Sequence, residues 1–334
     1  MKSGVVSPEL IAQLPVSPLR VAVLGYGSQG RAWAQNLTEA GHRVTVGLPD
    51  GSDSHKIAEV DGIKSASFTE AIEDAEAVCF LIPDIHQAEI YSEIQERIRV
   101  GAMLVFAHGF SLYFNRIVPR EDLDVTLIAP MCPGNTLRES WLGGPPVFGL
   151  FAVAKDASDL ARNKGLIIAR DLGLTRTGLV ETNLEEETVT DIFAEQAVLC
   201  GGVSALVREA FNALVRAGYS PEVSFLCCLF ELKNTVALMQ EKGIYGAFES
   251  ISHCAAYGSL KNGALPLADD VSQRFKRQIE EIQSGDFARE LERDINLGSP
   301  VYARRIGELE MHPIEIARRT LLDKLDKLSR DHDE

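Results

Sequence analysis

The sequence of 334 residues predicts an α/β domain with a doubly wound parallel sheet, followed by an all-helical domain. Two patterns carry this prediction. In the first half, short hydrophobic runs alternate with helical patterns, as in βαβ units, and long helical patterns replace them from about Leu184. The length also exceeds the roughly 250–300 residues at which single cores tend to split. We therefore expect two domains, at residues 1–182 and 183–334.

Six runs have the apolar content of strands in a parallel sheet. In chain order they are RVAVLGYG, HRVTVGL, AVCFLIPD, MLVFAHGF, VTLIAP and PVFGLFAVA. The helical domain opens with two long segments, EETVTDIFAEQAVLCGGVSALVREAFNALVRAGY and SPEVSFLCCLFELKNTVALMQEKG. Further helices are expected up to the C-terminus.

Composition and charge exclude several classes of partner. The chain has 33 Lys and Arg against 48 Asp and Glu, a formal charge of -15, which repels nucleic acid and anionic lipid. The N-terminal segment does not have the pattern of a signal peptide, and no uncharged apolar stretch reaches about 18 residues. We expect a cytoplasmic protein without nucleic-acid or membrane partners. The six cysteines have no zinc spacing, so we expect free thiols, most of them in the core.

The strongest local motif is Gly25-x-Gly27-x-x-Gly30, which leaves the first long strand and opens a helix. Glycines at this spacing let the backbone approach a pyrophosphate at the N-terminus of the helix. The alternative is an ordinary tight turn. With a strand before the motif and a helix after it, the pattern predicts a Rossmann-like dinucleotide-binding domain.

The loop after the second strand, PDGSDSH, lies where the adenine ribose is read in such domains. Asp50 and Asp53 can accept hydrogen bonds from a free 2′-hydroxyl and would repel a 2′-phosphate, and the loop has no Arg or Lys before Lys56. The loop therefore favours NADH over NADPH. Two alternatives stay open: the aspartates only cap a turn, or Ser52 and Ser54 bind a phosphate.

In the helical domain, Asp191 and Glu195 are four residues apart and project from one face of a helix. Their flanking residues are apolar, and burying two unpaired carboxylates there would be costly. The pair therefore predicts a site for a hard cation such as Mg²⁺. A solvated acidic face is the alternative.

Taken together, the motifs GYGSQG, LIPDIHQAEIY, FAHGF, ETVTDIFAEQAVLCGG, FELK, SIS and HPIE resemble the short class of ketol-acid reductoisomerases. The resemblance covers nearly the whole chain. It implies an NADPH site in the first domain and two Mg²⁺ ions on helices of the second. It also implies an alkyl shift in an acetohydroxy acid followed by hydride transfer, and a knotted helical domain that shares residues across a homodimer or higher homo-oligomer.

The resemblance and the motifs together assign site residues. The cofactor-binding set is Gly25, Tyr26, Gly27, Ser28, Gln29, Gly30, Asp50, Ser52, Asp53, Ser54, Pro83, Asp84, His86 and Gly134. The metal ligands are Asp191, Glu195 and Glu231, and the catalytic set is His108, Glu231 and Ser252. We expect His108 to orient or protonate the substrate, with a packed loop histidine as the alternative.

The chain departs from the family pattern at several positions, and two of them, in the loop after the fifth predicted strand and in the second helical segment, lose a charge near the expected metal site. The family has a lysine where APMCPGN has Met131, and a glutamate where FLCCLFELK has Cys227. A thiol is a poor ligand for Mg²⁺, so Cys227 indicates a lost second metal, a softer metal, or a small apolar side chain that fills space. We expect a substrate pocket formed by Met131, Cys132, Cys227 and Ser252.

Next to Ser252, the residues His253, Cys254 and Ala256 replace the family's usual Asn, Thr and Glu. We therefore predict an NAD(P)H-dependent reductase of a small carbonyl or imine compound, similar to a 2-keto acid, with impaired isomerase activity and one Mg²⁺ or none. The alternatives are a functional ketol-acid reductoisomerase of branched-chain amino acid biosynthesis and a non-catalytic NAD(H)-binding paralogue.

Overall fold

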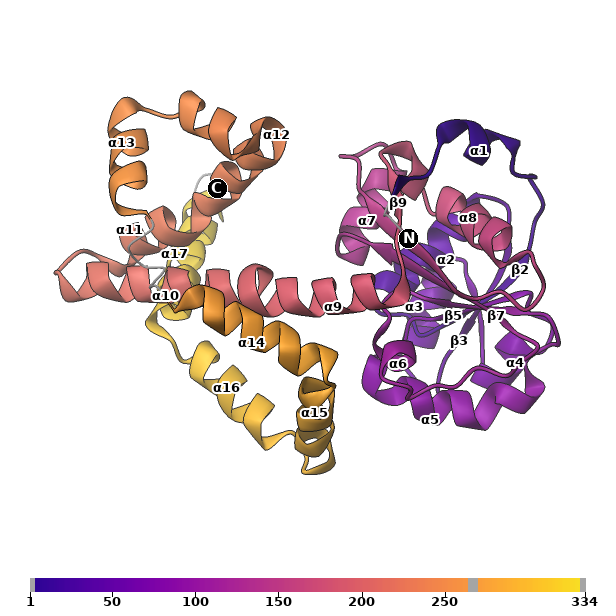
Figure 1. Cartoon of the computed structure of the whole chain (residues 1–334). Helices are drawn as coiled ribbons and strands as arrows, with labels where there is room; N and C mark the ends of the chain where they lie inside the picture. Colours follow the sequence, from indigo (N-terminus) through magenta and orange to yellow (C-terminus); the bar gives the residue numbers. More distant parts are fainter. Residues whose placement is uncertain (1–3, 264–269, 331–334) are drawn as a thin grey trace. The chain divides into compact units, whose positions relative to one another are not determined.

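The computed structural model describes residues 4–263 and 270–330 (Figure 1). Contacts divide the chain into two compact units, Met1–Thr190 and Asp191–Glu334. The division falls inside helix α9 (Leu184–Ala194), because the first turns of this helix pack on the first unit.

The first unit is built on a nine-stranded sheet in the described residues, in the order β1-β9-β8-β7-β6-β5-β2-β3-β4. The six strands β4-β3-β2-β5-β6-β7 run parallel. Strand β8 is antiparallel to β7, and β1 is antiparallel to β9. The strands are β1 (Gly4–Val5), β2 (Arg20–Leu24), β3 (Arg43–Gly47), β4 (Lys64–Ala66), β5 (Ala77–Phe80), β6 (Met103–Phe106), β7 (Asp124–Pro130), β8 (Gly149–Lys155) and β9 (Leu179–Glu181).

All six predicted strand runs contain a strand, and the predicted α/β class is confirmed. Strands β1, β4 and β9 were not predicted. They have two or three residues each and lie at or next to a sheet edge, so they carry too few apolar residues to give a pattern.

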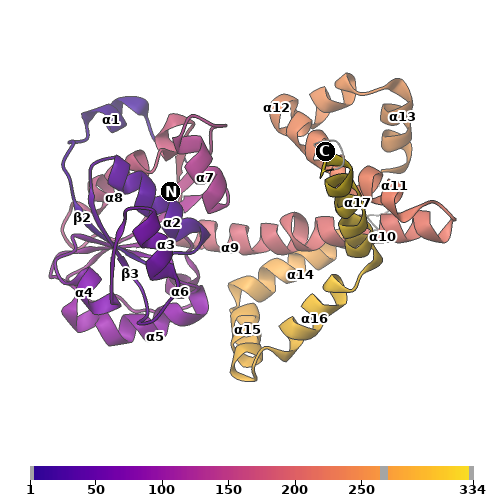
Figure 2. The ribbon, with the colours of Figure 1, turned by 180° about the vertical axis from the view of Figure 1, so that it is seen from behind.

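Helices cover both faces of the sheet, as a doubly wound fold requires (Figures 1 and 2). One face is buried by α2, α7 and α8, with Trp33 of α2 fully enclosed, and the other by α4, α5 and α6. The helices and 3₁₀ turns of this unit are α1 (Pro8–Gln13), α2 (Ser28–Glu39), α3 (Ser54–Val60), α4 (Phe68–Ile72), α5 (Asp84–Ile94), η1 (Gln95–Arg97), α6 (Phe110–Tyr113), α7 (Gly134–Trp141), α8 (Ala161–Asp171) and η2 (Leu174–Arg176).

The strand order brings the carboxyl ends of four central strands together in the first unit. Strand β2 pairs with β3 on one side and β5 on the other, so the direction of winding reverses at β2. Since β2, β5, β6 and β7 are parallel, the loops that follow them leave the same edge of the sheet. A crevice at such a reversal is where doubly wound folds bind ligands.

The second unit is helical throughout the residues that the structure describes. Helices α12 and α13 lie on one side of α10, and α14, α15 and α16 on the other (Figures 1 and 2). Its helices are α10 (Gly201–Arg216), α11 (Pro221–Phe225), α12 (Leu232–Ser250), α13 (His253–Asn262), α14 (Val271–Gln283), α15 (Asp286–Asn296), α16 (Pro300–Glu310) and α17 (Pro313–Arg330).

Neither long predicted helix is regular. A π-helical turn, η3 (Glu195–Leu199), separates α9 from α10, and a second, η4 (Leu226–Phe230), separates α11 from α12. The sequence analysis did not predict these turns, because propensity does not distinguish a π turn from an α turn. Such turns occur frequently at functional sites. The first begins at the predicted ligand Glu195, and the second contains Cys227.

The helical unit leaves many apolar side chains exposed. The stretch Leu184–Arg216 is long and apolar enough to span a membrane by length and composition, and only 11% of its most apolar window is buried. Leu199, Leu206 and Phe230 are more than half exposed. The prediction that most cysteines lie in the core was wrong: all six lie in described residues, and only Cys79 is fully buried.

Asp124, the first residue of β7, ties this strand to α8 and to the turn before it. Its carboxylate is fully buried and accepts hydrogen bonds from Lys164 Nζ at 2.7 Å and from the hydroxyl and backbone N–H of Ser158. Burial alone would raise the pKa of Asp124, but these hydrogen bonds outweigh it and hold the pKa below its usual value. The charge therefore stabilises the folded state at neutral pH.

We predict that Asp124→Ala lowers the free energy of unfolding by about 3 kcal/mol, because Lys164 loses its partner inside the protein. Asp53→Ala, which removes an exposed ion pair with Lys56, should change little. Because the folded-state pKa is depressed, the stabilisation exists above the unfolded pKa of about 4 and is lost as the pH falls through the folded value. Urea denaturation at decreasing pH from 7 measures this: the difference between wild type and Asp124→Ala should shrink as the pH falls below about 4, and a difference that grows there would contradict it.

Candidate functional site

The glycine motif forms a cradle at the carboxyl end of β2. Gly25 has a φ of +97°, and a Cβ there would lie 2.9 Å from the carbonyl oxygen of Leu81. A Cβ on Gly30 would lie 2.2 Å from the carbonyl oxygen of Gly25, so only glycine lets α2 start this close to the strand. A Cβ on Gly27 would meet no protein atom, which leaves open space beside the N-terminus of α2. This geometry fits a pyrophosphate.

The side chains between these glycines are engaged by the protein. Tyr26 is buried and donates its hydroxyl to Asp61 Oδ2 at 2.9 Å, and Arg31 binds both oxygens of Asp61 at 2.7 Å. Burial and this hydrogen bond raise the pKa of Tyr26 far above its usual value, and Arg31 lowers the pKa of Asp61. The backbone of this loop, rather than the Tyr26 hydroxyl, is therefore free to face a cofactor.

The loop that follows β7 packs directly on this cradle. Gly134 donates its backbone N–H to Ser28 Oγ at 3.1 Å, and a Cβ on Gly134 would lie 2.0 Å from the carbonyl oxygen of Ser28. The N-termini of α2 and α7 consequently meet at one point of the sheet edge. Two helix N-termini place partial positive charge there, which favours an anion.

Met131 and Cys132 occupy the turn between β7 and α7. The side chain of Met131 is half exposed, and its backbone N–H donates to the carbonyl of Phe148 at 2.9 Å. Cys132 is half buried, and burial raises the pKa of its thiol. A thiol with a raised pKa is a poor nucleophile, so this geometry does not favour Cys132 as a catalytic residue.

The predicted ribose-reading loop lies between β3 and α3. Asp50 and Asp53 are both exposed, and Lys56 Nζ pairs with Asp53 Oδ1 at 3.0 Å. Ser52 Oγ accepts the backbone N–H of Ser54 at 3.3 Å. The charge of Asp53 is thus partly balanced by Lys56, and Asp50 is the less compensated carboxylate.

The predicted cofactor residues Pro83, Asp84 and His86 start helix α5, after β5. Pro83 is the N-cap, the backbone N–H of His86 donates to the Pro83 carbonyl at 2.9 Å, and the His86 ring is exposed. Because Gly25 touches Leu81, this turn lies beside the glycine cradle.

A second group of polar side chains joins the loop after β6 to helix α9. Potential ligand atoms of His108, Glu187 and Asp191 all lie within 4.8 Å of one another. Glu187 is only 1% exposed, and its Oε2 accepts the backbone N–H of Gly109 at 3.0 Å. Asp191, the first residue of the second unit, continues the same helix one turn later. Two carboxylates and an imidazole suit a divalent cation.

The hydrogen bond at His108 indicates the role of its ring. The backbone N–H of Phe110 donates to Nδ1 at 3.3 Å. In the neutral ring, an accepting Nδ1 leaves the hydrogen on Nε2. Nε2–H can then donate a hydrogen bond, whereas ligation of a metal through Nε2 would require the loss of this hydrogen.

Glu187 is the residue that sequence reasoning missed. It stands in a run of acidic residues, Glu185 to Glu187, that resembles the usual acidic first turn of a helix. Its position four residues before Asp191 repeats the spacing between Asp191 and Glu195, and this repeat is the signal that could have identified it.

The other predicted residues lie elsewhere in the second unit. Glu195 begins η3, and Glu231 follows η4 and is exposed, as is Cys227. Ser252 is the N-cap of α13 and accepts the backbone N–H of Ala255 at 3.2 Å. None of these four belongs to the group formed by His108, Glu187 and Asp191.

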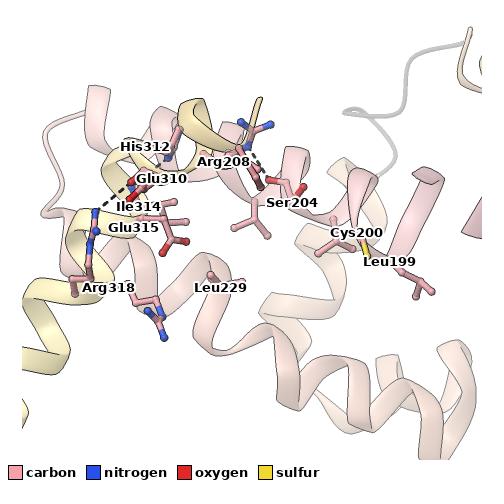
Figure 3. A pocket seen from close by; sticks show the side chains of 15 residues that line it. Leu199, Cys200, Ser204, Arg208, Leu229, Glu310, His312, Ile314, Glu315 and Arg318 are labelled. Carbon is pink, nitrogen blue, oxygen red and sulfur yellow. Dashed lines mark hydrogen bonds between the residues drawn. The ribbon is translucent and has the colours of Figure 1, made fainter. Parts of the chain in front are cut away.

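A cavity of about 690 Å³ opens between α10, α16 and α17 of the helical unit (Figure 3). Its lining is mainly apolar and also includes Arg208, His312 and Arg318. None of the predicted site residues lines it. Size alone therefore does not identify the site in this chain.

Comparison with known proteins decides the family. Residues 16–178 match the family described as acetohydroxy acid isomeroreductase, NADPH-binding domain, and residues 184–326 match ketol-acid reductoisomerase, C-terminal domain. The chain belongs to the ketol-acid reductoisomerase family. A ketol-acid reductoisomerase (NADP(+)) of Saccharolobus islandicus is 42% identical over 292 residues, which are 87% of each chain.

Solved structures agree with this assignment. An NADH-preferring ketol-acid reductoisomerase from an uncultured archean superposes with a TM-score of 0.90 at 34% identity, over 96% of this chain and 98% of that one. A semialdehyde dehydrogenase NAD-binding protein from Cupriavidus necator, with a TM-score of 0.62 at 19% identity over 80% and 98% of the two chains, shares the fold alone.

These matches confirm the predicted family, the predicted fold class and the prediction of an NAD(P)H-dependent oxidoreductase. They do not test the two departures from the family pattern, Met131 and Cys227, which stay predictions about this chain.

Proposed function

We propose that the chain is a reductase of the ketol-acid reductoisomerase family that transfers hydride from NADH to a small 2-keto acid and is a poor isomerase. The observation that carries the proposal is Met131. It lies half exposed in the loop packed on the cofactor cradle, at the position where the family pattern has a lysine. A thioether supplies neither charge nor a hydrogen-bond donor at this edge of the sheet.

The two half-reactions depend differently on that missing charge. Alkyl migration spreads negative charge over the substrate oxygens, and a preorganised cationic or metal contact is typically worth about 3–4 kcal/mol in such a transition state. Hydride transfer needs one polarised carbonyl and a donor for the developing alkoxide. His108 Nε2–H suits the second role, since Nδ1 is engaged by Phe110.

We propose that one Mg²⁺ binds to Asp191, with Glu187 or Glu195 as a further ligand. Their oxygen atoms are the donors this ion prefers, and ligand atoms of Glu187, Asp191 and His108 lie within 4.8 Å of one another. A bound Mg²⁺ would polarise the substrate carbonyl. The family pattern has a second pair of glutamates four residues apart, and the matching positions here are Cys227 and Glu231. A thiol in place of this oxygen donor argues against a second Mg²⁺.

The preference for NADH is argued from the ribose loop. The names of the relatives point both ways, since one is specified as NADP(+)-dependent and another as NADH-preferring. In this chain Asp50 and Asp53 supply two negative charges, and Lys56 balances only one of them. A 2′-phosphate would meet net negative charge, although solvent reduces the effect at exposed groups.

We further propose a cytoplasmic homodimer in which a second copy covers the helical unit and contributes Glu231 and Ser252 to the site. The exposed apolar residues of α10 and η4, among them Leu199, Leu206 and Phe230, support this, because a monomer rarely exposes so much contiguous apolar surface. A protein cover explains the apolar stretch Leu184–Arg216 without a membrane. The knot implied by the resemblance stays a prediction.

The two half-reactions can be measured separately. With NADH and Mg²⁺ we expect negligible turnover of 2-acetolactate but measurable turnover of 3-hydroxy-3-methyl-2-oxobutanoate, the 2-keto acid that methyl migration would produce. Loss of two contacts should slow isomerisation by several orders of magnitude. Met131→Lys with Cys227→Glu should raise acetolactate turnover, whereas Met131→Leu serves as the uncharged control. Robust acetolactate conversion by the unmodified protein would mean an ordinary ketol-acid reductoisomerase, and no turnover of either compound would support a non-catalytic paralogue.

The second prediction concerns the cofactor. NADH should bind roughly fivefold more tightly than NADPH, as measured by titration of nucleotide fluorescence. Asp50→Asn and Asp53→Asn should each reduce this ratio, because each removes one of the two negative charges near the 2′ position. Lys56→Ala should increase it. If NADPH binds more tightly, Ser52 and Ser54 rather than the aspartates face the ribose.

The third prediction concerns assembly. Sedimentation equilibrium should give twice the chain mass of 36.5 kDa at micromolar concentration. Leu206→Glu with Phe230→Glu should shift the mass toward the monomer, because each buries a charge in the apolar contact. The exposed pair Val16→Glu with Val60→Glu, in the first unit, is the control. A monomeric wild-type protein would refute the shared site.

A further inference from the structure

A chain of hydrogen bonds connects the core of the first unit with the loop that carries Met131. Trp33 is fully buried on α2, and its indole Nε1–H donates to Gln29 Oε1 at 3.2 Å. Gln29 Nε2 in turn donates to the backbone carbonyl of Cys132 at 2.8 Å. The amide of Gln29 therefore bridges the cofactor cradle and the turn after β7.

The partners at both ends determine the orientation of this amide. An indole nitrogen can only donate and a carbonyl can only accept. The Gln29 oxygen must therefore face Trp33, and its nitrogen must face Cys132. A reversed amide would break both hydrogen bonds, so Trp33 selects the orientation that holds the loop.

The same loop is held at two other points. Gly134 donates its N–H to Ser28 Oγ, and Met131 donates its N–H to the carbonyl of Phe148. Met131 is consequently placed between one anchor at Phe148, the residue before β8, and two on the first turn of α2. The α2 anchors are side chains of Ser28 and Gln29, whose backbone forms the N-terminus that faces the proposed pyrophosphate.

We propose that Gln29, oriented by Trp33, is a positioning residue that makes the order of the Met131 loop depend on the bound dinucleotide. A pyrophosphate at the N-terminus of α2 would restrain Ser28 and Gln29, and their side chains would pass this restraint to residues 131–134. The inference rests on the proposed function only in assigning a dinucleotide to the cradle and a substrate to Met131. It does not require turnover.

Cys132 provides a direct readout of the loop, because its own carbonyl accepts the Gln29 hydrogen bond and its thiol is half buried. We would measure the rate of alkylation of Cys132 by iodoacetamide at pH 8.5, by peptide mass spectrometry, with and without saturating NADH. Saturation would be established for each variant by titration. The exposed Cys254, in the second unit, provides an internal reference rate.

We expect NADH to slow the alkylation of Cys132 about fivefold in the wild-type protein, the effect of about one net hydrogen bond. In Gln29→Met, which keeps the size and removes both hydrogen bonds, protection should fall below about twofold. Trp33→Phe removes only the orienting donor and should give intermediate protection. Gln95→Met, a half-buried glutamine after the C-terminal end of α5 whose amide donates to the Ser92 carbonyl, is the matched control and should keep full protection.

Two outcomes would overturn the inference: equal protection by NADH in the wild type and in Gln29→Met, or no protection in the wild type although NADH binds. Because the measurement contains no carbonyl substrate, a failure of the proposed reductase activity leaves it unaffected. Steady-state kinetics adds a second test. For the 2-keto acid, Gln29→Met should raise KM about tenfold more than it raises KM for NADH, whereas a purely structural defect would affect both.

Discussion

The close contact between Gly134 and Ser28 is the constraint on which the site in the first unit depends. A side chain at position 134 would collide with the backbone of α2, so glycine alone lets the two helix N-termini meet. This contact brings a loop that follows β7 against a loop that follows β2, although two strands lie between them in the sheet. It also explains how a protein with a formal charge of -15 can bind an anionic cofactor, since the local field of two helix N-termini opposes the net charge.

We propose that charge in the site is distributed differently from the family pattern. Met131 would replace a lysine, while Glu187 and Asp191 supply carboxylates on α9. Without the lysine, the site would depend more on a metal ion for positive charge. With Cys227 in place of a glutamate, we propose that one Mg²⁺ supplies what a lysine and two ions supply in the family pattern.

The two π turns give the helical unit a local irregularity at the positions that matter for this chemistry. Each inserts an extra residue into a helix and changes which side chains share a face downstream. One starts at Glu195 and the other contains Cys227, so both predicted metal pairs coincide with a departure from α-helical geometry. Many apolar residues on these same helices are exposed, which is consistent with a unit that completes its core with a second copy.

The sequence by itself determined the order and type of the main elements, the glycine cradle and the family. Strands such as β2 and β7 are apolar along their whole length, and Gly25, Gly27 and Gly30 stand at a spacing that sterics impose on a phosphate-binding turn, so local patterns are sufficient. The structure alone decided which polar groups meet. The bond of Glu187 to Gly109, the pairing of Tyr26 and Arg31 with Asp61, and the link from Gln29 to Cys132 join residues 30 to 103 positions apart. Such contacts depend on strand order and helix packing, and neither propensity nor periodicity encodes them; the short strands and the π turns escaped prediction because their stability comes from neighbours rather than from their own residues.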